Sequence, residues 1–381
     1  MRVLWVSNDL PPRHGGIEQF VANLLERVHP DSTVVVGPGR TQDHVVYDAA
    51  QPYRIVRCGG AVLPTPRLRR LVLSVAARHR PDVVVLGASW PLGALAPSLR
   101  RHLGTPIVAL SHGLEAGLVT AGAGGVLGRA TRDVDIVTTI SDFTERALAD
   151  HVGAARLRRL APGVDVERFH PDVDGSRLRT SWGVPLDAPV VGCVSRLVPR
   201  KGQDALLAAW PRIQRSHPEA WLVLVGDGPS GRSLRRRVRR GGLRHVVIPG
   251  SVPWDRLPEA HAALDVFAMP CRSRLGGLDV EGLGIVYLEA QASGVPVVAG
   301  RSGGAPEAVR DGVSGTVVDG RRPGQIADAV IGWLDDPVTR AAAGDAGRRW
   351  VCRNWEWSVI AEEFTDILAE AVRRAGDRDP R

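Results

Sequence analysis

One short segment of the chain combines several cations with glycine just before a helical stretch. It reads Ser195-Arg196-Leu197-Val198-Pro199-Arg200-Lys201-Gly202-Gln203 and follows a β-branched run. Cations and a helix N-terminus both attract anions, and together they favour a diphosphate. Lys201 is the only lysine among the 49 Lys and Arg residues. Because an ammonium is a compact point charge and a guanidinium is a planar fork, we expect this site to depend on the size of its cation.

A second segment, residues 276–290, places two carboxylates eight residues apart around a glycine-rich loop. Glu281 lies in the loop and can accept hydrogen bonds from sugar hydroxyls. Glu289 lies on the following helix and can hold a ribose diol, as the acidic residue of a dinucleotide site does. The amides of Gly284-Ile285-Val286 would face a phosphate between them. Glycosidases also pair two carboxylates, but hydrolysis of a neutral glycoside needs no diphosphate-binding cations nearby.

A third loop, Pro11-Pro12-Arg13-His14-Gly15-Gly16-Ile17-Glu18, follows the first β-branched run and precedes a helix of period Ile17, Val21, Leu24, Leu25, Val28. Paired glycines allow a backbone to approach a ligand closely and expose amide groups at a helix N-terminus. A Gly-Gly pair after a strand is often only a turn. This loop alone therefore does not define a site.

The elements that position these loops are short apolar runs alternating with helical stretches. The runs lie at residues 3–7, 33–36, 83–86, 107–110 and 136–138, and again at 190–194, 221–225, 246–248, 266–269 and 295–299. Such runs are typical of parallel strands covered on both faces. We therefore predict an α/β fold with two Rossmann-like, doubly wound domains, at 1–168 and 169–355, facing a central cleft with ligands at the carboxyl ends of the strands.

The composition excludes several classes of protein. The 381 residues include 44% hydrophobic and 24% charged residues, which is typical of a globular chain. The four cysteines are far apart without a C-x-x-C pair, so neither a disulfide framework nor a zinc ribbon is indicated, and no metal site is expected. The N-terminus lacks the pattern of a signal peptide, and no run reaches the ~20 apolar residues of a membrane span. We expect a cytoplasmic protein.

The net charge of +8 raises the question of an anionic partner. Residues 67–80 form a basic amphipathic pattern that could lie on an anionic lipid surface, although the pattern favours an ordinary helix packing its apolar face on its own sheet. A solvated helix face explains the arginines of residues 232–240. A nucleic-acid binder would be strongly salt-dependent, but the basic residues are not interleaved with aromatics, and only 5% of the chain is aromatic. No nucleic-acid partner is expected.

Together these motifs resemble the family 4 glycosyltransferases of GT-B fold. The resemblance covers nearly the whole chain and rests on the Glu281-x7-Glu289 pair, the Ser-Arg-Leu and Lys-Gly motif, the Gly-Gly loop, Ser111-His112-Gly113 and the linker Pro162-Gly163-Val164-Asp165. Residues 195–204 and 270–290 are more narrowly similar to the actinobacterial phosphatidylinositol mannosyltransferases, in particular the branch that adds the second mannose. The helix at 356–373 is then expected to pack back on the first domain.

The resemblance implies a retaining, metal-independent transfer of mannose from GDP-mannose to phosphatidylinositol monomannoside, by a peripheral protein at the inner face of the plasma membrane. It makes Arg196 and Lys201 the residues that hold the diphosphate, Glu281 the residue that orients the mannose and Glu289 the one that holds the ribose. The residues it assigns to catalysis are His112, Arg196, Lys201 and Glu281. Those it assigns to the donor are Gly16, Arg196, Lys201, Val252, Glu281, Gly284, Ile285, Val286 and Glu289.

The acceptor side departs from the family pattern at one position. The phosphatidylinositol enzymes typically carry Gln after Gly-Gly-Ile, and here Glu18 stands in that place. Two anions within ~4 to 6 Å repel each other, so either Arg13 and His14 compensate at an acceptor phosphate, or the acceptor lacks that phosphate. A family 4 enzyme with a soluble or natural-product acceptor, possibly using another nucleotide sugar, remains the alternative. A catalytically silent nucleotide-sugar sensor is disfavoured by the complete set of Arg196, Lys201, Glu281 and Glu289.

Overall fold

The computed structural model describes residues 1–12, 15–39 and 42–377, and it divides the chain into two compact units. The first unit comprises Met1–Gly163 together with the C-terminal segment that begins at Trp357, and the second unit is Val164–Glu356. The chain thus leaves the first unit a few residues before the boundary at 168 that the sequence suggests. It returns to the first unit at Trp357, where its last helix begins.

The first unit contains a sheet of seven parallel strands in the order β3-β2-β1-β4-β5-β6-β7. Its strands are β1 (Val3–Val6), β2 (Thr33–Gly37), β3 (Arg54–Arg57), β4 (Val83–Leu86), β5 (Ile107–Ala109), β6 (Ile136–Thr139) and β7 (Leu157–Arg159). The order reverses direction between β1 and β4, and the loops at the carboxyl ends of strands beside such a reversal are where open α/β sheets bind ligands. The sequence predicted the five inner strands, and it missed β3 and β7, which form the two edges.

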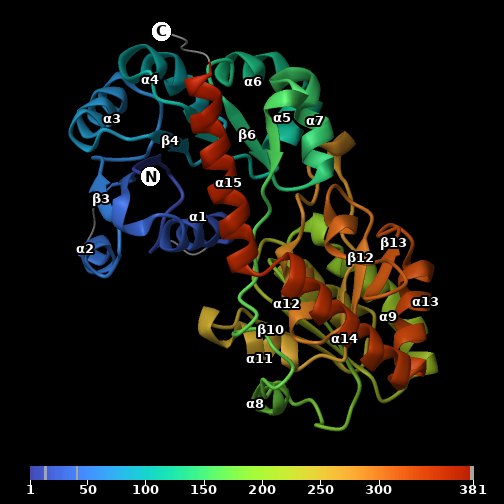
Figure 1. Ribbon diagram of the computed structural model, residues 1–381. Helices are drawn as coiled ribbons and strands as arrows, with labels where there is room; N and C mark the ends of the chain where they lie inside the picture. The colour runs from blue at the N-terminus through green and yellow to red at the C-terminus, as the bar shows by residue number, and fades with distance from the viewer. Residues whose placement is uncertain (13–14, 40–41, 378–381) are drawn as a thin grey trace. The chain divides into compact units, whose positions relative to one another are not determined.

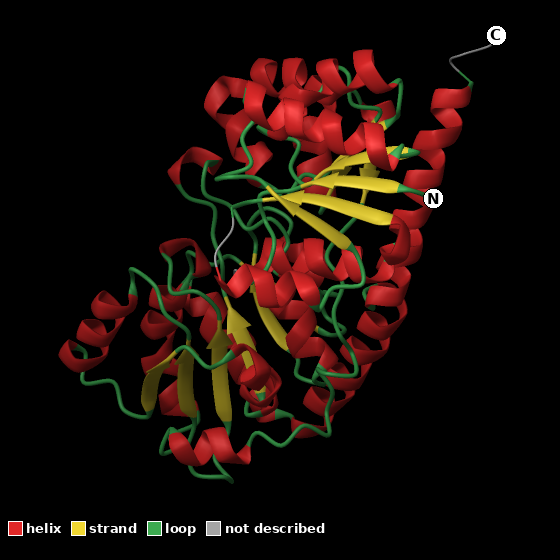
Figure 2. Cartoon of the chain, turned by 90° about the vertical axis from the view of Figure 1, so that its left-hand side faces the viewer, coloured by secondary structure: helices red, strands yellow, loops and turns green. Residues whose placement is uncertain are grey.

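Helices cover both faces of this sheet, as the red and yellow elements of Figure 2 show. They are α1 (Gly16–Arg27), α2 (Gln42–Ala49), α3 (Pro66–His79), α4 (Ala96–Leu103), α5 (Leu114–Leu118), α6 (Gly124–Ala130), α7 (Asp142–Val152) and α15 (Trp357–Gly376), with the short turns η1 (Pro30–Ser32), η2 (Leu92–Leu95), η3 (Val119–Ala123) and η4 (Ala154–Arg156). Successive side chains of a strand point to opposite faces. Val3 and Trp5 of β1 therefore join one core, and Leu4 and Val6 join the other.

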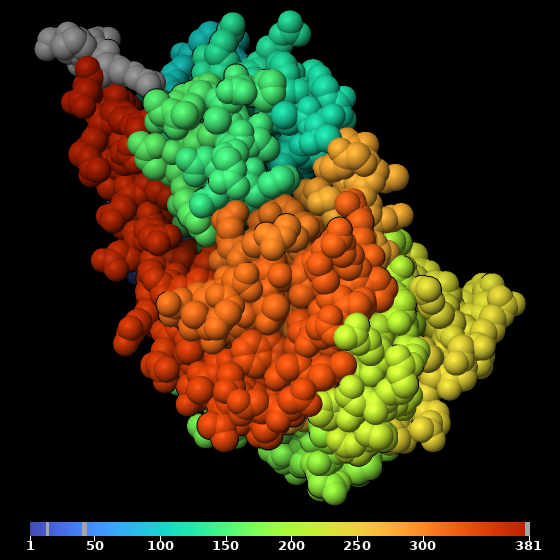
Figure 3. Space-filling view, turned by 90° about the vertical axis from the view of Figure 1, so that its right-hand side faces the viewer, coloured from blue at the N-terminus to red at the C-terminus, as the bar shows by residue number. Residues whose placement is uncertain are grey.

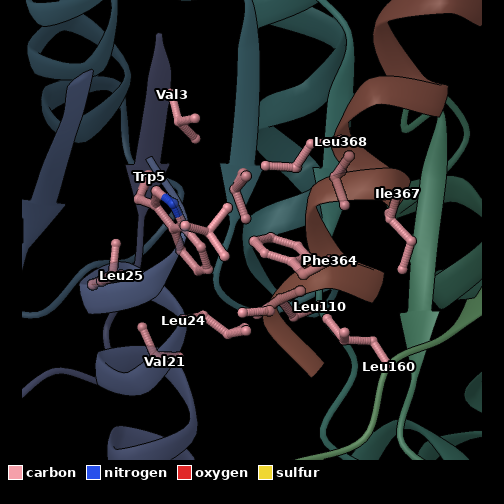
Figure 4. Packing of buried hydrophobic residues seen from close by; sticks show 14 of the residues in the cluster. Val3, Trp5, Val21, Leu24, Leu25, Leu110, Leu160, Phe364, Ile367 and Leu368 are labelled. Carbon is pink, nitrogen blue, oxygen red and sulfur yellow. The ribbon is translucent and has the colours of Figure 1, made fainter. Parts of the chain in front are cut away.

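The last helix, α15, completes the core on one face of the first sheet, where it runs beside α1 (Figure 1). Phe364 is fully buried and its ring lies 5.5 Å from that of Trp5 (Figure 4). Further along the helix, the Glu370 carboxylate lies 2.6 Å from the guanidinium of Arg158 in β7. Ile360, Leu368 and other apolar residues of α15 belong to the same core. The first unit therefore depends on residues from both ends of the chain.

The second unit contains six parallel strands in the order β10-β9-β8-β11-β12-β13. They are β8 (Val190–Val194), β9 (Trp221–Val225), β10 (Val246–Gly250), β11 (Val266–Met269), β12 (Val297–Gly300) and β13 (Gly315–Val318). Its helices are α8 (Ser176–Ser181), α9 (Gln203–Ser216), α10 (Gly231–Arg240), α11 (Leu257–Ala262), α12 (Ile285–Ala292), α13 (Pro323–Asp335) and α14 (Pro337–Asn354), with η5 (Pro199–Lys201), η6 (Trp254–Arg256), η7 (Leu275–Gly277) and η8 (Ala305–Ala308). Here too the order reverses at the centre, between β8 and β11.

The two basic helices are both ordinary surface helices. In α3, Leu68, Val72 and Val75 are buried against the sheet, while Arg67, Arg69 and other arginines are exposed. The apolar stripe of α3 is thus part of the core, as the sequence pattern favoured. Helix α10 lies on the surface of the second unit (Figure 3, yellow) and buries little apart from Leu234. Among the described residues, no helix is long and apolar enough to cross a membrane.

Candidate active site

The cationic motif follows β8, at the centre of the second sheet, and is anchored by its own backbone. Lys201 ends the short turn η5, and Gly202 caps α9 with φ +79°. A Cβ on Gly202 would lie 2.0 Å from the carbonyl oxygen of Pro270, so glycine is required by both its conformation and its neighbour. The side-chain amide nitrogen of Gln203 donates to the Ser195 hydroxyl at 3.0 Å and to the Arg196 carbonyl at 3.1 Å. The loop is therefore held in one shape.

Lys201 and Glu281 form a buried ion pair in this site. The Lys201 Nζ lies 2.9 Å from the Glu281 Oε2, and the two residues are 8% and 6% exposed. The Arg200 Nε lies 3.4 Å from the same oxygen, and another nitrogen of Arg200 lies 3.6 Å from Asp279. Burial alone would raise the pKa of Glu281, but the charges and hydrogen bonds of Lys201 and Arg200 outweigh it and lower that pKa below its ordinary value.

Arg196 differs from its two neighbouring cations. Its side chain is exposed, and within the part of the chain that the structure describes its guanidinium has no hydrogen bond or ion pair. A guanidinium presents five donors in a fixed fork, which suits the oxygens of a phosphate. Arg196 is therefore available to an anionic ligand, whereas Lys201 already has a carboxylate partner.

The glycine-rich loop ends at the first turn of α12. Gly284 precedes this helix with φ +87°, and a Cβ there would lie 2.7 Å from the ring of Tyr287. No side chain caps the helix, so the first amides, those of Ile285 and Val286, have no partner within it. Both residues are half-buried. The amides of Ile285 and Val286 thus lack a partner within the helix, at the position where the sequence predicts donors to a phosphate.

The two carboxylates of the Glu281-x7-Glu289 motif have different surroundings. Glu289 lies on α12 and is 6% exposed, and its Oε2 lies 3.5 Å from the Nε2 of His261. It also interacts electrostatically with Arg168, whose guanidinium lies over the Trp254 ring at 4.7 Å. Sequence reasoning missed both His261 and Arg168, because neither belongs to a motif.

Val252 lies in the loop after β10, next to a segment with a defined anchor. The amide of Ser251 donates to the Asp227 carboxylate at 3.0 Å, and these hydrogen bonds from Ser251 lower the pKa of Asp227. Val252 is half-buried, and Gly250 before it has φ +98°. The hydrogen bond to Asp227 thus anchors the loop next to Val252.

In the first unit, His112 follows β5 and is fixed by two neighbours. Its Nε2 lies 2.6 Å from the carbonyl oxygen of Gly87. Because a carbonyl can only accept, this nitrogen donates, and the lone pair of a neutral ring is then on Nδ1. Phe20 contacts the ring edge-on at 5.8 Å. His112 is therefore held in one orientation and one tautomer.

Glu115, which the sequence reading did not single out, supports the turn that carries His112. It is 3% exposed and accepts hydrogen bonds from the Ser89 and Ser111 hydroxyls, both at 2.8 Å, and from the His112 amide at 3.3 Å. Gly113 has φ +91°, which lets the chain turn into α5 after His112. Its spacing, three residues after His112 at the start of a helix, is the signal that could have indicated it.

The Gly-Gly loop opens α1, with Gly16 exposed at the first helical position. Glu18 is 9% exposed and occupies the third position of the helix, where acidic residues commonly reach back toward the N-cap. A Cβ on Gly15 would lie 2.3 Å from the Glu18 Oε2, so the carboxylate packs against that glycine. Glu18 thus has a local role in the turn. The predicted acceptor residues Arg13 and His14 lie outside the described residues.

Burial limits the reactivity of two cysteines of the second unit. Burial raises the pKa of the Cys193 thiol to about 11 and that of the Cys271 thiol to about 12. Neither thiol is therefore a thiolate nucleophile near neutral pH. Among the described residues, no three His, Cys, Asp or Glu side chains are grouped so as to hold a metal ion.

Two family descriptions match the chain, one for each half. Residues 14–168 match Glycosyltransferase Family 4, and residues 175–350 match Glycosyl transferases group 1. Their common border lies in the linker between β7 and α8. The two matches together cover most of the chain.

Curated relatives match along the whole length. The chain is 44% identical to the GDP-mannose-dependent alpha-(1-6)-phosphatidylinositol monomannoside mannosyltransferase of Mycolicibacterium smegmatis, over 96% of this chain and 98% of that protein. It is 39% identical to the GDP-mannose-dependent monoacylated alpha-(1-6)-phosphatidylinositol monomannoside mannosyltransferase of Corynebacterium glutamicum, over 98% of this chain and 99% of that protein.

Solved structures share the fold at lower identity. Anabaena Alr3699/HepE in complex with UDP superposes with a TM-score of 0.82 at 22% identity, covering 97% of this chain and 100% of that chain. Sucrose-phosphate synthase from Thermosynechococcus elongatus superposes with a TM-score of 0.79 at 22% identity, covering 98% and 100%. With its two parallel sheets, the chain has the same two-domain, Rossmann-like architecture as these proteins, which confirms the predicted fold class.

Proposed function

The chain belongs to the family 4 glycosyltransferases of GT-B fold, and from this premise we propose that it transfers mannose from GDP-mannose to phosphatidylinositol monomannoside, forming an alpha-1,6-linked dimannoside with retention of configuration. The observation that carries this proposal is the full-length identity of 44% to an enzyme of that name, combined with a second unit whose cations and carboxylates suit a nucleotide sugar. The enzyme would thus contribute to cell-envelope glycolipid synthesis.

Different residues of the second unit would bind different parts of the donor. Arg196, whose guanidinium has no hydrogen bond or ion pair among the described residues, and Lys201 would hold the diphosphate and stabilise the negative charge that develops on the leaving GDP. The first amides of α12, at Gly284-Ile285-Val286, would add neutral donors to the same phosphates. Val252 would meet the guanine through its backbone.

The Lys201–Glu281 ion pair would position the mannose of the donor. Glu281 uses its Oε2 for Lys201, so its Oε1 can accept from mannose hydroxyls. Because the same carboxylate touches both the diphosphate cation and the sugar, the anomeric carbon is held at a fixed distance from the leaving phosphate. Glu289 would bind the ribose diol. We assign no protein nucleophile, and the donor phosphate itself would take the proton of the acceptor hydroxyl.

The first unit is assigned to the acceptor. We propose that His112 contacts the transferred mannose, that Gly16 approaches the diphosphate, and that Arg13 and His14 bind the acceptor phosphate beside Glu18. The exposed arginines of α3 would hold the protein at the anionic inner face of the plasma membrane as a peripheral protein. Their attraction would be electrostatic, because the apolar face of α3 is part of the core.

An acceptor panel tests the proposal. Purified protein is given GDP-mannose with phosphatidylinositol, phosphatidylinositol monomannoside, free inositol and simple glycosides, and the products are identified by mass spectrometry. We expect one added hexose on the monomannoside lipid and much less on the others. Efficient transfer to a soluble glycoside, with none to the lipid, would instead establish the soluble-acceptor alternative.

A further inference from the structure

One buried side chain beside the donor residues lacks the partners that its chemistry requires. His261 of α11 is 0% exposed, and among the described residues neither of its ring nitrogens has a hydrogen-bond partner. Buried polar groups are nearly always hydrogen-bonded, because leaving one unpaired costs ~1 to 3 kcal/mol. An apolar residue could fill the same space without this cost. The imidazole therefore calls for an explanation beyond packing.

The packing around His261 fixes where its ring can point. Phe267 of β11 stacks on the ring at 5.6 Å with an interplanar angle of 26°, and Phe169 of the linker contacts it edge-on at 5.6 Å. The Nε2 then lies 3.5 Å from the Glu289 Oε2, which is close enough for an ion pair but lacks hydrogen-bond geometry. A small movement of either side chain would complete the bond.

The carboxylate of Glu289, in turn, lacks hydrogen-bond donors among the described residues. Its side chain is only 7% exposed, and apart from His261 and the electrostatic attraction of Arg168, no described group is directed at its carboxylate. A buried carboxylate is costly unless donors surround it. His261 can supply a donor on one side, and a ligand can supply donors on the other.

We propose that His261 is a positioning residue for nucleotide binding: its Nε2–H holds the Glu289 Oε2, so that the other oxygen, Oε1, accepts from the ribose hydroxyls of the nucleoside diphosphate. The inference rests on the assignment of Glu289 to the ribose. Because a carboxylate can only accept, the hydrogen of the imidazole must be on Nε2 for this role. The two phenylalanines keep the ring in place, and the ribose hydroxyls then meet an oxygen of fixed direction.

Two nucleotides isolate this effect from general damage to the fold. Isothermal titration measures Kd for GDP and for 2′,3′-dideoxy-GDP, which lacks the ribose hydroxyls, with the wild type and with His261→Gln, His261→Asn and His261→Phe. The amide nitrogen of Gln reaches the position of Nε2, whereas that of Asn reaches only the position of Nδ1, and Phe has no donor. A purely structural role would weaken both nucleotides equally in each variant.

We expect the wild type to bind GDP roughly tenfold or more tightly than the dideoxy nucleotide, as hydrogen bonds to a charged group allow. His261→Phe and His261→Asn should lose most of this ratio while their Kd for dideoxy-GDP changes less than about twofold, and His261→Gln should retain it. An unchanged ratio in both His261→Asn and His261→Phe would overturn the proposal. A wild type that does not distinguish the nucleotides, with Glu289→Gln behaving alike, would instead overturn the assignment of Glu289 to the ribose.

Discussion

The ammonium of Lys201 lies 2.9 Å from the Oε2 of Glu281, and both side chains are almost completely buried. These residues are eighty positions apart in the sequence, on loops that follow β8 and β11, the two strands at the reversal of the second sheet. The pair joins the cation proposed for the diphosphate to the carboxylate proposed for the mannose. It also gives the single lysine of an arginine-rich chain a defined place.

Lys201→Arg should lower kcat/KM for the donor at least tenfold while leaving the fold intact. Lys201 is almost completely buried, and a planar guanidinium cannot bind Glu281 and a phosphate from the position of one ammonium. Steady-state kinetics and circular dichroism of the variant measure the two effects. Arg212→Lys, on the exposed side of α9, is the matched control and should have normal activity. Near-normal turnover of Lys201→Arg would mean that the lone lysine has no special role.

The lowered pKa of Glu281 predicts how stability depends on pH. Its contribution to the free energy of unfolding is complete above the ordinary glutamate pKa of about 4.3, and it is lost as the pH falls below that value toward the lower pKa of the folded state. At pH 7, the free energy of unfolding of Glu281→Gln should be about 3 kcal/mol lower than that of the wild type, because Lys201 is left buried without its partner. Urea unfolding from pH 7 to pH 3.5 should show the difference from wild type shrinking below about pH 4.

The control for that experiment is Asp328→Asn, which removes an exposed partner of Arg212. Surface pairs contribute little, so this variant should follow the wild type at every pH. A difference between Glu281→Gln and wild type that stayed constant down to pH 3.5 would refute the stabilising role of the ion pair.

Glu115→Gln should reduce kcat about tenfold and change KM for the donor less than twofold. The carboxylate accepts from three donors, and the amide group of Gln would face one of them with another donor, which disturbs the turn that carries His112. Glu26→Gln, a half-exposed position on α1, provides the control. If the melting temperature fell together with kcat, and KM for the donor changed as much as kcat, Glu115 would have a role in folding alone.

Replacing Arg67, Arg69 and Arg70 of α3 by Gln should weaken binding to anionic vesicles roughly a hundredfold, at about 1 kcal/mol per arginine near the surface. Co-sedimentation with phosphatidylserine vesicles at several salt concentrations measures the effect, and added salt should reduce binding of the wild type. The matched control replaces Arg236, Arg239 and Arg240 of α10, which are also exposed. If both triple variants lost binding equally, the interaction would reflect net charge rather than α3.

The strands that the sequence predicted and those that it missed differ in position. Inner strands such as β1 and β8 are buried on both faces and consist almost entirely of apolar residues, so their pattern is plain. The missed strands β3, β7 and β13 all lie at sheet edges, although the remaining edge strand, β10, was predicted. Arg54 and Arg57 interrupt the apolar pattern of β3, and Arg159 interrupts that of β7. An edge strand needs only one partner, and its polar residues reach solvent.

The candidate site shows a similar division. Motifs placed Lys201, Glu281 and Glu289 on the correct loops and helix, because each lies in a segment that combines glycine with charge between a predicted strand and a predicted helix. No spacing could indicate that Lys201 meets Glu281, or that Glu289 meets His261, since only the sheet order brings these loops together. His261 was missed because a single buried polar residue resembles any core position in sequence.

The nucleotide that the enzyme releases identifies its donor most directly. Purified protein is incubated with phosphatidylinositol monomannoside and either GDP-mannose or UDP-glucose, and the free GDP or UDP is measured together with the lipid product. We predict release of GDP with an added mannose on the lipid, at a rate at least a hundredfold above that of UDP release. Release of UDP but not GDP would contradict GDP-mannose as the donor and, with it, the proposed mannosyltransferase activity.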